Sequence, residues 1–332
     1  MKFRYLLKTL LLGALVVGAD AATTFAITYT TLDDPLAAPN SSHATGISGA
    51  SIVGWYSDSS NVTHGFLYNG STYTTLDDPL AGPTRGTFAL GMSGGNIVGN
   101  YIDSSGFSHG FLYNGSTYTT LAKPNAYGIS GNNIVGFSTT AGGLSHGYLY
   151  DGSTYSTLDD PLAGTANGTG TRVFGISGSN VVGDYIDSSF RTHGFFFNGS
   201  TYTTLDDPLA TGGTTATGIS GGNIVGYYYD SAVTPHGFLY DGSTYTQLDD
   251  PLAVFGTFVN GIDGSNIVGG FNVASGAHGF VATVPEPSSV LLAAFGSLNL
   301  AIAGVLARRQ RYVVGLQPYH HLFLAGRSLS NL

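Results

Sequence analysis

Short runs of alternating apolar and polar residues fill most of this chain, and clusters of Gly, Asn, Asp and Ser separate them. In residues 64–76, for example, His-Gly-Phe-Leu-Tyr and Thr-Tyr-Thr-Thr-Leu flank the dipeptide Asn69-Gly70. Alternation with a period of two and many β-branched and aromatic residues predicts strands, and Asn-Gly between two such runs predicts a tight hairpin. The pattern therefore predicts an all-β protein of short antiparallel strands.

The sequence motif of residues 64–76 recurs along the chain with a period near 43 residues. His-Gly pairs mark the copies, at intervals of 45, 37, 47, 43 and 42 residues, and begin at His64, His109, His146, His193, His236 and His278. A repeat of this length built only from short strands is typical of a propeller blade.

Each repeat divides into four strand-like segments, and the ends of the array complement each other. The segment with the pattern G-[IM]-[SD] comes first and is expected innermost, where Gly and Ser fit a crowded axis. The sixth repeat begins at Gly261 and lacks its fourth strand, whereas residues 28–34 form a fourth strand without the first three. Docking one onto the other predicts a six-bladed β-propeller over residues 22–284. A linear β-solenoid is the alternative, but it would need polar caps that the sequence does not provide.

Charge and cysteine content narrow the partners of this region. Residues 22–284 contain four basic residues and eighteen aspartates, a net charge of 4 − 18 = −14, and the chain has no cysteine. Such an acidic surface repels phosphate backbones, so no nucleic-acid partner is expected. Cations and neutral polymers remain possible partners.

The N-terminal residues 1–21 have the pattern of a secretory signal peptide. Lys2, Arg4 and Lys8 precede an apolar run over 10–17, and the small residues Ala19 and Ala21 stand at the expected cleavage site. A short uncleaved membrane anchor is the alternative.

Residues 285–311 combine three features in order near the C-terminus. Pro285, Glu286 and Pro287 precede a mostly apolar segment over 290–306, long enough for a transmembrane helix, and Arg308 and Arg309 follow it. This order resembles the PEP-CTERM sorting signal of bacterial surface proteins. The resemblance implies processing by an exosortase-type enzyme, a membrane anchor before processing, and association with exopolysaccharide or biofilm matrix. Residues 312–332 form an extra tail that departs from the family pattern.

The repeats themselves resemble extracellular HAF-type repeats of bacteria. An aromatic-leucine-tyrosine strand alternates with a G-I-x-x-x-x-x-I-V-G segment over nearly all of residues 22–284. This resemblance implies a secreted or cell-surface protein and supports the repeat architecture.

Two repeated residue types are candidates for chemistry. The six histidines occupy six different blades, so we expect each imidazole to bond a backbone or hydroxyl group of a neighbouring strand. The Asp-Asp-Pro runs are expected to form turns. Ca²⁺ coordination is a weaker interpretation, with candidates Asp77, Asp78, Asp206 and Asp207, and no other cofactor is expected.

Residues that break the repeat are few, and none forms a nucleophile-base pair, an acid pair or a metal set by spacing. They are Trp55, Arg85, Met92, Lys123, Arg172, Asp184 and Arg191. The sequence thus favours a non-catalytic surface protein. A lectin-like propeller that stacks sugars on exposed faces of Trp55, Tyr227 and Tyr228, with one weak site per blade, is the alternative, and a glycan-active hydrolase or lyase is the least favoured.

Overall fold

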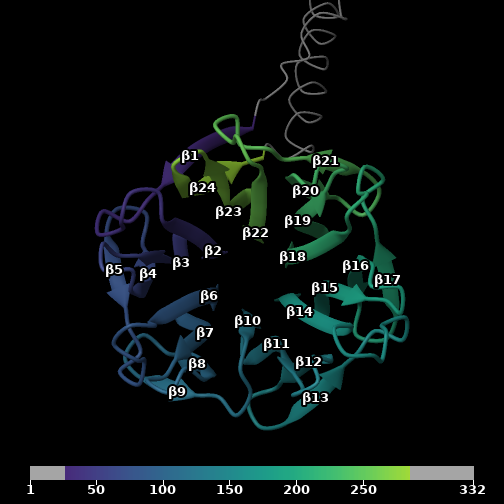
Figure 1. Cartoon of the computed structure of the whole chain (residues 1–332), viewed down its shortest axis with the longest axis horizontal. Coiled ribbons are helices and arrows are strands. Elements are labelled where there is room, and N and C mark those ends of the chain that lie inside the picture. Colours follow the sequence, from purple (N-terminus) through teal and green to yellow (C-terminus); the bar gives the residue numbers. More distant parts are fainter. Residues whose placement is uncertain (1–26, 285–332) are drawn as a thin grey trace, which may run out of the picture. The chain divides into compact units, whose positions relative to one another are not determined.

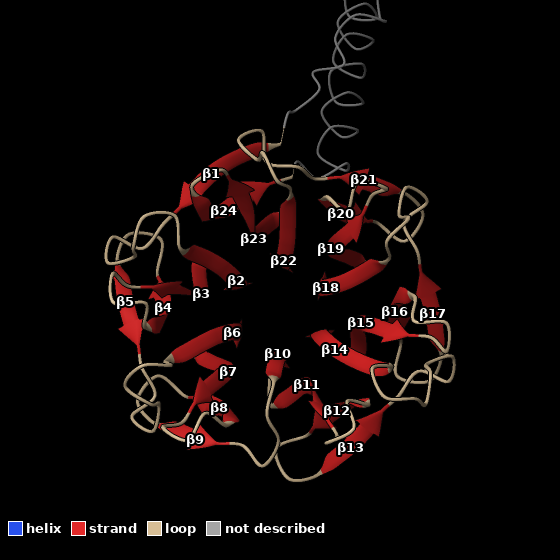
Figure 2. Ribbon diagram, viewed as in Figure 1, coloured by secondary structure: helices blue, strands red, loops and turns tan. Residues whose placement is uncertain are grey.

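The computed structural model describes residues 27–284, and every regular element in this range is a β-strand. The strands form sheets arranged around one axis, and within each sheet the strands follow one another from the axis outward (Figures 1 and 2). The sequence prediction of an all-β, propeller-type protein is confirmed.

Four strand positions recur from the axis outward. The innermost strands are β2 (Ser42–Ser48), β6 (Thr87–Ser93), β10 (Ala126–Ser130), β14 (Gly170–Ser177), β18 (Thr214–Ser220) and β22 (Thr257–Asp263). The second strands are β3 (Ser51–Ser57), β7 (Asn96–Ile102), β11 (Asn133–Thr139), β15 (Asn180–Ile186), β19 (Asn223–Tyr229) and β23 (Asn266–Val273). The third strands are β4 (Thr63–Tyr68), β8 (Ser108–Tyr113), β12 (Ser145–Tyr150), β16 (Thr192–Phe197), β20 (Pro235–Tyr240) and β24 (Gly276–Thr283). The outermost strands are β5 (Tyr73–Leu76), β9 (Tyr118–Thr120), β13 (Tyr155–Leu158), β17 (Tyr202–Leu205), β21 (Tyr245–Gln247) and β1 (Thr28–Leu32).

Hydrogen bonding groups the strands into four separate four-stranded sheets and one eight-stranded sheet, so four separate blades are seen instead of the six expected. The eight-stranded sheet has two halves, β10–β13 and β14–β17, and each repeats the strand order of the separate sheets. A single parallel pair, Ser145 with Gly170, joins these halves. It forms because β14 begins early enough for its first residue to reach the edge of β12.

The N-terminal strand completes the last sheet, as the sequence predicted. β1 pairs antiparallel with β24, from Thr28 opposite Thr283 to Leu32 opposite Gly279. Main-chain hydrogen bonds thus join the two ends of the array, and β1 supplies the outermost strand that the last sheet would otherwise lack.

The innermost strands approach each other through glycines. A Cβ atom built on Gly46 would lie 3.0 Å from the Cα of Gly91, and one on Gly175 would lie 3.1 Å from the Cα of Gly218. Any side chain here would push neighbouring strands apart, which confirms the predicted crowding at the axis.

The hydrophobic core lies between neighbouring sheets. In one cluster, Val182 of β15 packs with Ala216, Ile219 and Phe238 of the following sheet. Similar clusters occupy other junctions between sheets, and one lies between the two halves of the eight-stranded sheet, so each four-strand group buries its faces mainly against its neighbours.

Several predicted segments lie outside the described residues. These are the signal-peptide positions Ala19 and Ala21, the sorting residues Pro285, Glu286, Pro287, Arg308 and Arg309, the apolar segment 290–306 and the tail 312–332. Within residues 27–284, the structure contains no helix with the length and apolar character needed to cross a membrane.

The glycine contacts at the axis predict a position-dependent effect of a single methyl group. Gly175→Ala should lower the free energy of unfolding by about 2 kcal/mol or more, because the new Cβ would lie 2.8 Å from the carbonyl oxygen of Thr217. The control Gly222→Ala should change it by less than about 0.5 kcal/mol, since its Cβ meets no atom within 4 Å. Urea unfolding of both variants tests this, and equal stability of the two would contradict it.

Candidate functional site

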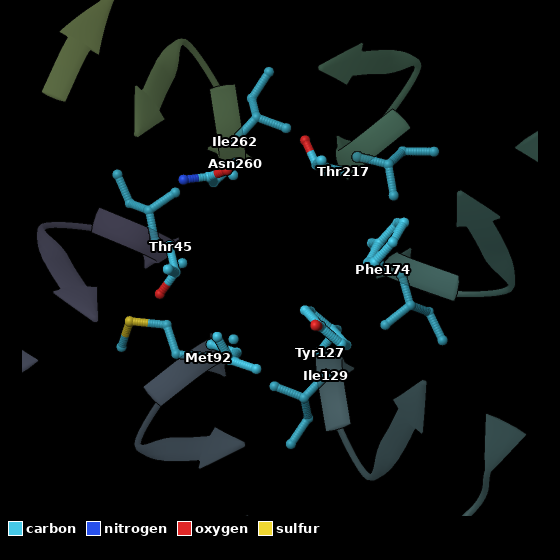
Figure 3. A pocket seen from close by; sticks show the side chains of 18 of the residues that line it. Thr45, Met92, Tyr127, Ile129, Phe174, Thr217, Asn260 and Ile262 are labelled. Atoms are coloured by element: carbon cyan, nitrogen blue, oxygen red, sulfur yellow. The ribbon is translucent and has the colours of Figure 1, made fainter. Parts of the chain in front are cut away.

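A β-bulge in each innermost strand turns one side chain toward the axis. The pairing of β2 with β3 slips by one residue between Ala44 and Gly46, which leaves Thr45 unpaired. The same slip recurs in every innermost strand, and the unpaired residues are Thr45, Leu90, Tyr127, Phe174, Thr217 and Asn260. Figure 3 shows Thr45, Tyr127, Phe174, Thr217 and Asn260 converging on one opening. We call the space that these residues surround the central channel.

Next to each bulge, a residue of the innermost strand, or Asn125 just before β10, lies opposite a residue of the second strand. His43 of β2 and Trp55 of β3, for example, are cross-strand partners. Six such residue sets surround the channel, and no two have the same residues. They are His43 with Trp55, Phe88 with Asn100, Asn125 with Phe137, Arg172 with Asp184, Thr215 with Tyr227, and Phe258 with Gly270. Cross-strand neighbours are close enough to touch, so each set presents one combined surface.

Two adjoining cavities occupy the channel. One has a volume of about 360 Å³ and is lined by Arg172, Phe174 and Thr217, among others. The other, of about 570 Å³, is lined by Trp55, Phe88 and Phe258. Both are bounded by Thr45, Leu90, Tyr127, Tyr227 and Asn260, so the cavities adjoin each other. Such volumes suit a small-molecule ligand.

Aromatic pairs occupy three of the junctions between successive four-strand groups around the channel. Trp55 meets Phe88 with ring centroids 5.3 Å apart. Tyr127 meets Phe174 at 5.1 Å. Tyr227 meets Phe258 at 5.0 Å. Edge-to-face contacts of this kind fix the ring planes, so the channel wall has three preformed aromatic surfaces.

Polar contacts occupy the other three junctions. The Asn100 side chain accepts a hydrogen bond from the backbone N–H of Ala126 at 3.2 Å. Thr215 donates its hydroxyl to Asp184 at 2.9 Å. Asn260 donates its amide to the carbonyl of Ala44 at 2.9 Å. Aromatic pairs thus occupy every second junction around the axis, and at two of these junctions the hydroxyls of Thr45 and Thr217 also donate across, to the carbonyls of Ala89 and Val259.

Arg172 and Asp184 form a bidentate ion pair at the channel. Arg172 Nε donates to Oδ1 of Asp184 at 2.7 Å and Nη2 donates to Oδ2 at 2.6 Å. Burial raises the pKa of the Asp184 carboxyl, and the Arg172 guanidinium acts in the opposite direction. The carboxylate is fully buried, whereas the Arg172 side chain is 31% exposed and lines the smaller cavity.

His43 is a neutral aromatic group in this site. Its ring stacks on Trp55 with centroids 3.8 Å apart. Burial lowers the pKa of His43 to about 4. The imidazole is therefore uncharged at neutral pH and extends the aromatic surface of Trp55.

The aromatic residues expected to stack on sugars separate into two groups. Trp55 and Tyr227 line the channel, so they meet at one shared cavity instead of forming one site per blade. Tyr228 does not line the channel, because side chains alternate along β19: it is 2% exposed, packs between sheets and stacks on His236. The prediction for Tyr228 was therefore wrong.

The repeat-breaking residues divide in the same way. Arg172 and Met92 line the smaller cavity and Trp55 lines the larger one, whereas Asp184 is fully buried and reaches the channel only through its bond to Arg172. Met92 also packs between sheets. Lys123 lies over the ring of Tyr148, 5.3 Å from its centroid. Arg85 and Arg191 lie in the connections before β6 and before β16. Sequence reasoning missed Phe88, Tyr127, Phe174, Phe258 and Asn260, although the varying residue before each G-[IM]-[SD] pattern was a usable signal.

The repeated histidines are structural, but their partners differ from those expected. Five of them bond the first aspartate of an Asp-Asp pair, as His64 Nδ1 does with Asp77 at 2.9 Å. His109 bonds Asp103 instead at 2.9 Å, because its repeat has Ala122 and Lys123 where the others have the pair. A charge-assisted bond to a carboxylate is stronger than the backbone or hydroxyl bond that the sequence suggested.

The two carboxylates of an Asp-Asp pair serve different partners. Asp77 and Asp206 bond histidines, whereas the buried Asp78 and Asp207 each accept a backbone N–H two residues later, from Leu80 and Leu209. This is an Asx-turn, as the turn interpretation expected. Burial raises the pKa of Asp78 and of Asp207. In the described range, no three His, Asp or Glu side chains lie close enough together to hold a metal ion.

Comparison with known proteins supports the architecture. No protein-family model matches the chain, and no curated protein matches its sequence. Among solved structures, the lectin of Aleuria aurantia bound to α-methyl-L-fucoside is similar, with a TM-score of 0.50 and 13% identity over 75% of this chain and 95% of the lectin. The same lectin bound to Fucα1-6GlcNAc gives a TM-score of 0.51 and 12% identity over 74% of this chain and 93% of the lectin. At this identity the likeness shows the β-propeller fold alone.

The pKa of His43 predicts an acid-sensitive contribution to stability. Between pH 6.5 and pH 4 the unfolded state binds a proton that the folded state excludes, so stability falls as the pH falls through this window. The loss should approach about 3 kcal/mol at pH 4. His43→Phe should remove it, so the stability of the variant relative to the wild type should increase as the pH falls. Urea unfolding from pH 4 to 7 tests this, and parallel profiles for the two proteins would contradict it.

Proposed function

We propose that this protein is a non-catalytic, carbohydrate-binding β-propeller of the extracellular space, with its binding site in the central channel. In this proposal the two halves of the eight-stranded sheet each count as one blade, which makes six. The observation that carries the proposal is that aromatic pairs occur at every second junction around the channel and side-chain hydrogen bonds at the junctions between them.

The chemistry of a sugar suits such a wall. A pyranose ring has apolar C–H faces that pack on aromatic rings and a rim of hydroxyl groups that need hydrogen-bond partners. The rings of Trp55 and Tyr227 lie on the channel wall, and Asn260 and Arg172 supply polar groups within the same space. A concave site that is mostly apolar with a few placed polar groups is the usual form of a small-ligand site.

The charged groups of the channel favour binding over hydrolysis. A glycosidase needs two carboxyl groups on either side of the scissile bond, separated by roughly 5–10 Å. The carboxylate at this channel, Asp184, has both oxygens bonded by Arg172, and Thr215 donates to one of them as well. Asp184 is therefore committed to its neighbours and is poorly placed to act as an acid or nucleophile.

The structural neighbours support the same class of function. Both Aleuria aurantia structures are of a lectin in complex with fucose-containing ligands. The likeness is one of fold, so it supports a carbohydrate-binding propeller and leaves the sugar to be identified by experiment.

We also propose that the chain reaches the cell surface through its terminal segments. This rests on the sequence pattern of residues 1–21 and of residues 285–311, with its implied exosortase-type processing enzyme and exopolysaccharide-rich surroundings. A propeller delivered to such a matrix would meet glycans at high local concentration.

Glycan binding should depend on the channel aromatics. Wild-type protein on a glycan array should bind a defined subset of oligosaccharides. Trp55→Ala and Tyr227→Ala should each weaken the affinity for the best of these about tenfold, ~1.4 kcal/mol, because each removes a stacking surface. Titration calorimetry provides the affinities.

Phe190→Ala is the matched control, because Phe190 is an exposed aromatic residue in a connecting loop. Its affinity should equal that of the wild type. Absence of any array binding by folded wild-type protein would refute the proposed function.

Sorting can be tested in the native cells. The wild-type product should be trimmed near Ala21 and near Pro285 and be released or matrix-bound, whereas the triple variant Pro285→Ala, Glu286→Ala, Pro287→Ala should stay in the membrane fraction. Intact mass and cell fractionation measure both. A wild type that is untrimmed and behaves like the variant would show that the exosortase assignment is wrong.

A further inference from the structure

We infer that the central channel is one asymmetric site that holds a single segment of an uncharged glycan per protein, and that the Arg172–Asp184 pair sets the preference for an uncharged ligand. This inference rests on the proposed carbohydrate-binding function. It adds the number of ligands, their charge class and the residues responsible.

The argument for a single ligand comes from the channel lining. A ring of identical side chains would present the same contact in every repeat, but here the six residue sets next to the bulges all differ. The bulge residues differ as well, from Thr45 and Asn260 to Tyr127 and Phe174 (Figure 3). The glycines and the Ile or Met residues of the smaller cavity do repeat around the axis, so the asymmetry comes from the bulge residues and the residue sets next to them. The channel therefore offers one set of contacts to one bound molecule, unlike an array of equivalent sites on the repeats.

The argument for an uncharged ligand comes from the ion pair. Both oxygens of Asp184 are occupied, by Nε and Nη2 of Arg172, and Thr215 donates a third hydrogen bond. The Asp184 carboxylate already neutralises the guanidinium, so an anionic sugar that bonds the remaining N–H groups of Arg172 would place a second negative charge close to a fully buried one. A cationic ligand would have to displace Arg172 from Asp184, because both carboxylate oxygens are occupied. The pair as a whole therefore offers a ligand no net charge.

Arg172 has N–H donors that the bonds to Asp184 do not use. A guanidinium has five N–H donors, and the bonds to Asp184 use one on Nε and one on Nη2. The side chain is 31% exposed and lines the smaller cavity. Its remaining donors suit hydroxyl oxygens of a neutral sugar, with Asp184 holding the planar group in place.

The remaining charges reinforce this preference. The other three basic residues within residues 27–284 are Arg85, Lys123 and Arg191, and all three lie in connections between strands. The net charge of −14 over residues 22–284 repels acidic polysaccharides at long range. The described part of the chain thus offers an acidic glycan no attraction at the channel to offset this repulsion.

The strand directions indicate where the ligand enters. The innermost strands run from the long connecting loops, such as residues 77–86, toward the tight turns that lead into the second strands, and His43, Phe88 and Arg172 lie near their beginnings. The varied residue sets therefore lie next to the mouth on the loop side, where an entering ligand would meet them first.

The experiment uses the full-length chain with a glycan array that carries neutral and uronic-acid oligosaccharides. Calorimetric titration with the tightest neutral hit should give a stoichiometry of one. The affinity for uronate-containing oligosaccharides should be at least tenfold weaker. It should stay weaker in 0.5 M salt, because salt screens the long-range repulsion by the net charge but not the short-range effect of the Arg172–Asp184 pair. The double variant Arg172→Met/Asp184→Leu should lose at least tenfold in affinity for the neutral hit, whereas Arg191→Met should keep wild-type affinity.

Each outcome separates this inference from the proposed function. No binding to any oligosaccharide would overturn both. Binding with a stoichiometry near six, or binding unaffected by Trp55→Ala, would keep a carbohydrate-binding protein but place its sites outside the channel. Preference for uronates would overturn the charge assignment alone. If the double variant does not fold, as judged by circular dichroism, stoichiometry and charge preference of the wild type still decide the inference.

Discussion

The close approach of the innermost strands at glycine residues is the constraint on which the rest of the structure depends. Gly261 completes this ring, because a Cβ there would lie 3.0 Å from the carbonyl oxygen of Thr45 at the other end of the array. With backbone against backbone, six inner strands fit around one axis. The bulge that immediately precedes each glycine then turns the neighbouring side chain toward that axis. The same local geometry both closes the ring and creates the channel lining.

The outer part of each repeat holds the sheets together by a different set of contacts. A histidine on the third strand bonds an aspartate that follows the outermost strand and stacks on an aromatic residue of the second, as His193 does with Asp206 and Tyr185. The next aspartate, Asp207, is buried and caps the turn that leads to the following sheet. These contacts recur with little change, so stability rests on a repeated framework. The channel contributes the Arg172–Asp184 pair, which is a strong local contact but occurs in a single sheet.

Much of the fold could be predicted from the sequence because it depends on local rules applied many times. Alternation, Asn-Gly turns and the complementary ends specified the strands, their order and the pairing of β1 with β24. Positive φ at Gly70, for instance, is what the hairpin prediction required. The link between β12 and β14 was not predictable, since it depends on where one strand happens to begin. For the site, Trp55, Arg172 and Asp184 were flagged as departures from the repeat, but their meeting at one place follows from six strands converging, which no local pattern encodes.

Tyr227 and Tyr228 show why a symmetric fold can hold an asymmetric site. They are adjacent on β19, and alternation sends them to different environments: Tyr228 packs between sheets and Tyr227 lines the channel. A residue between sheets must fit a neighbour built on the same plan, so the position of Tyr228 is aromatic in five repeats, as Tyr56, Tyr101, Tyr185, Tyr228 and Phe271. A residue at the channel has no neighbouring sheet to fit, so its size and chemistry can differ from repeat to repeat. The corresponding channel positions are accordingly Trp55, Asn100, Phe137, Asp184, Tyr227 and Gly270. Packing between sheets therefore requires repetition, and the channel is the place in this architecture where side chains of different chemistry can be combined without disturbing it.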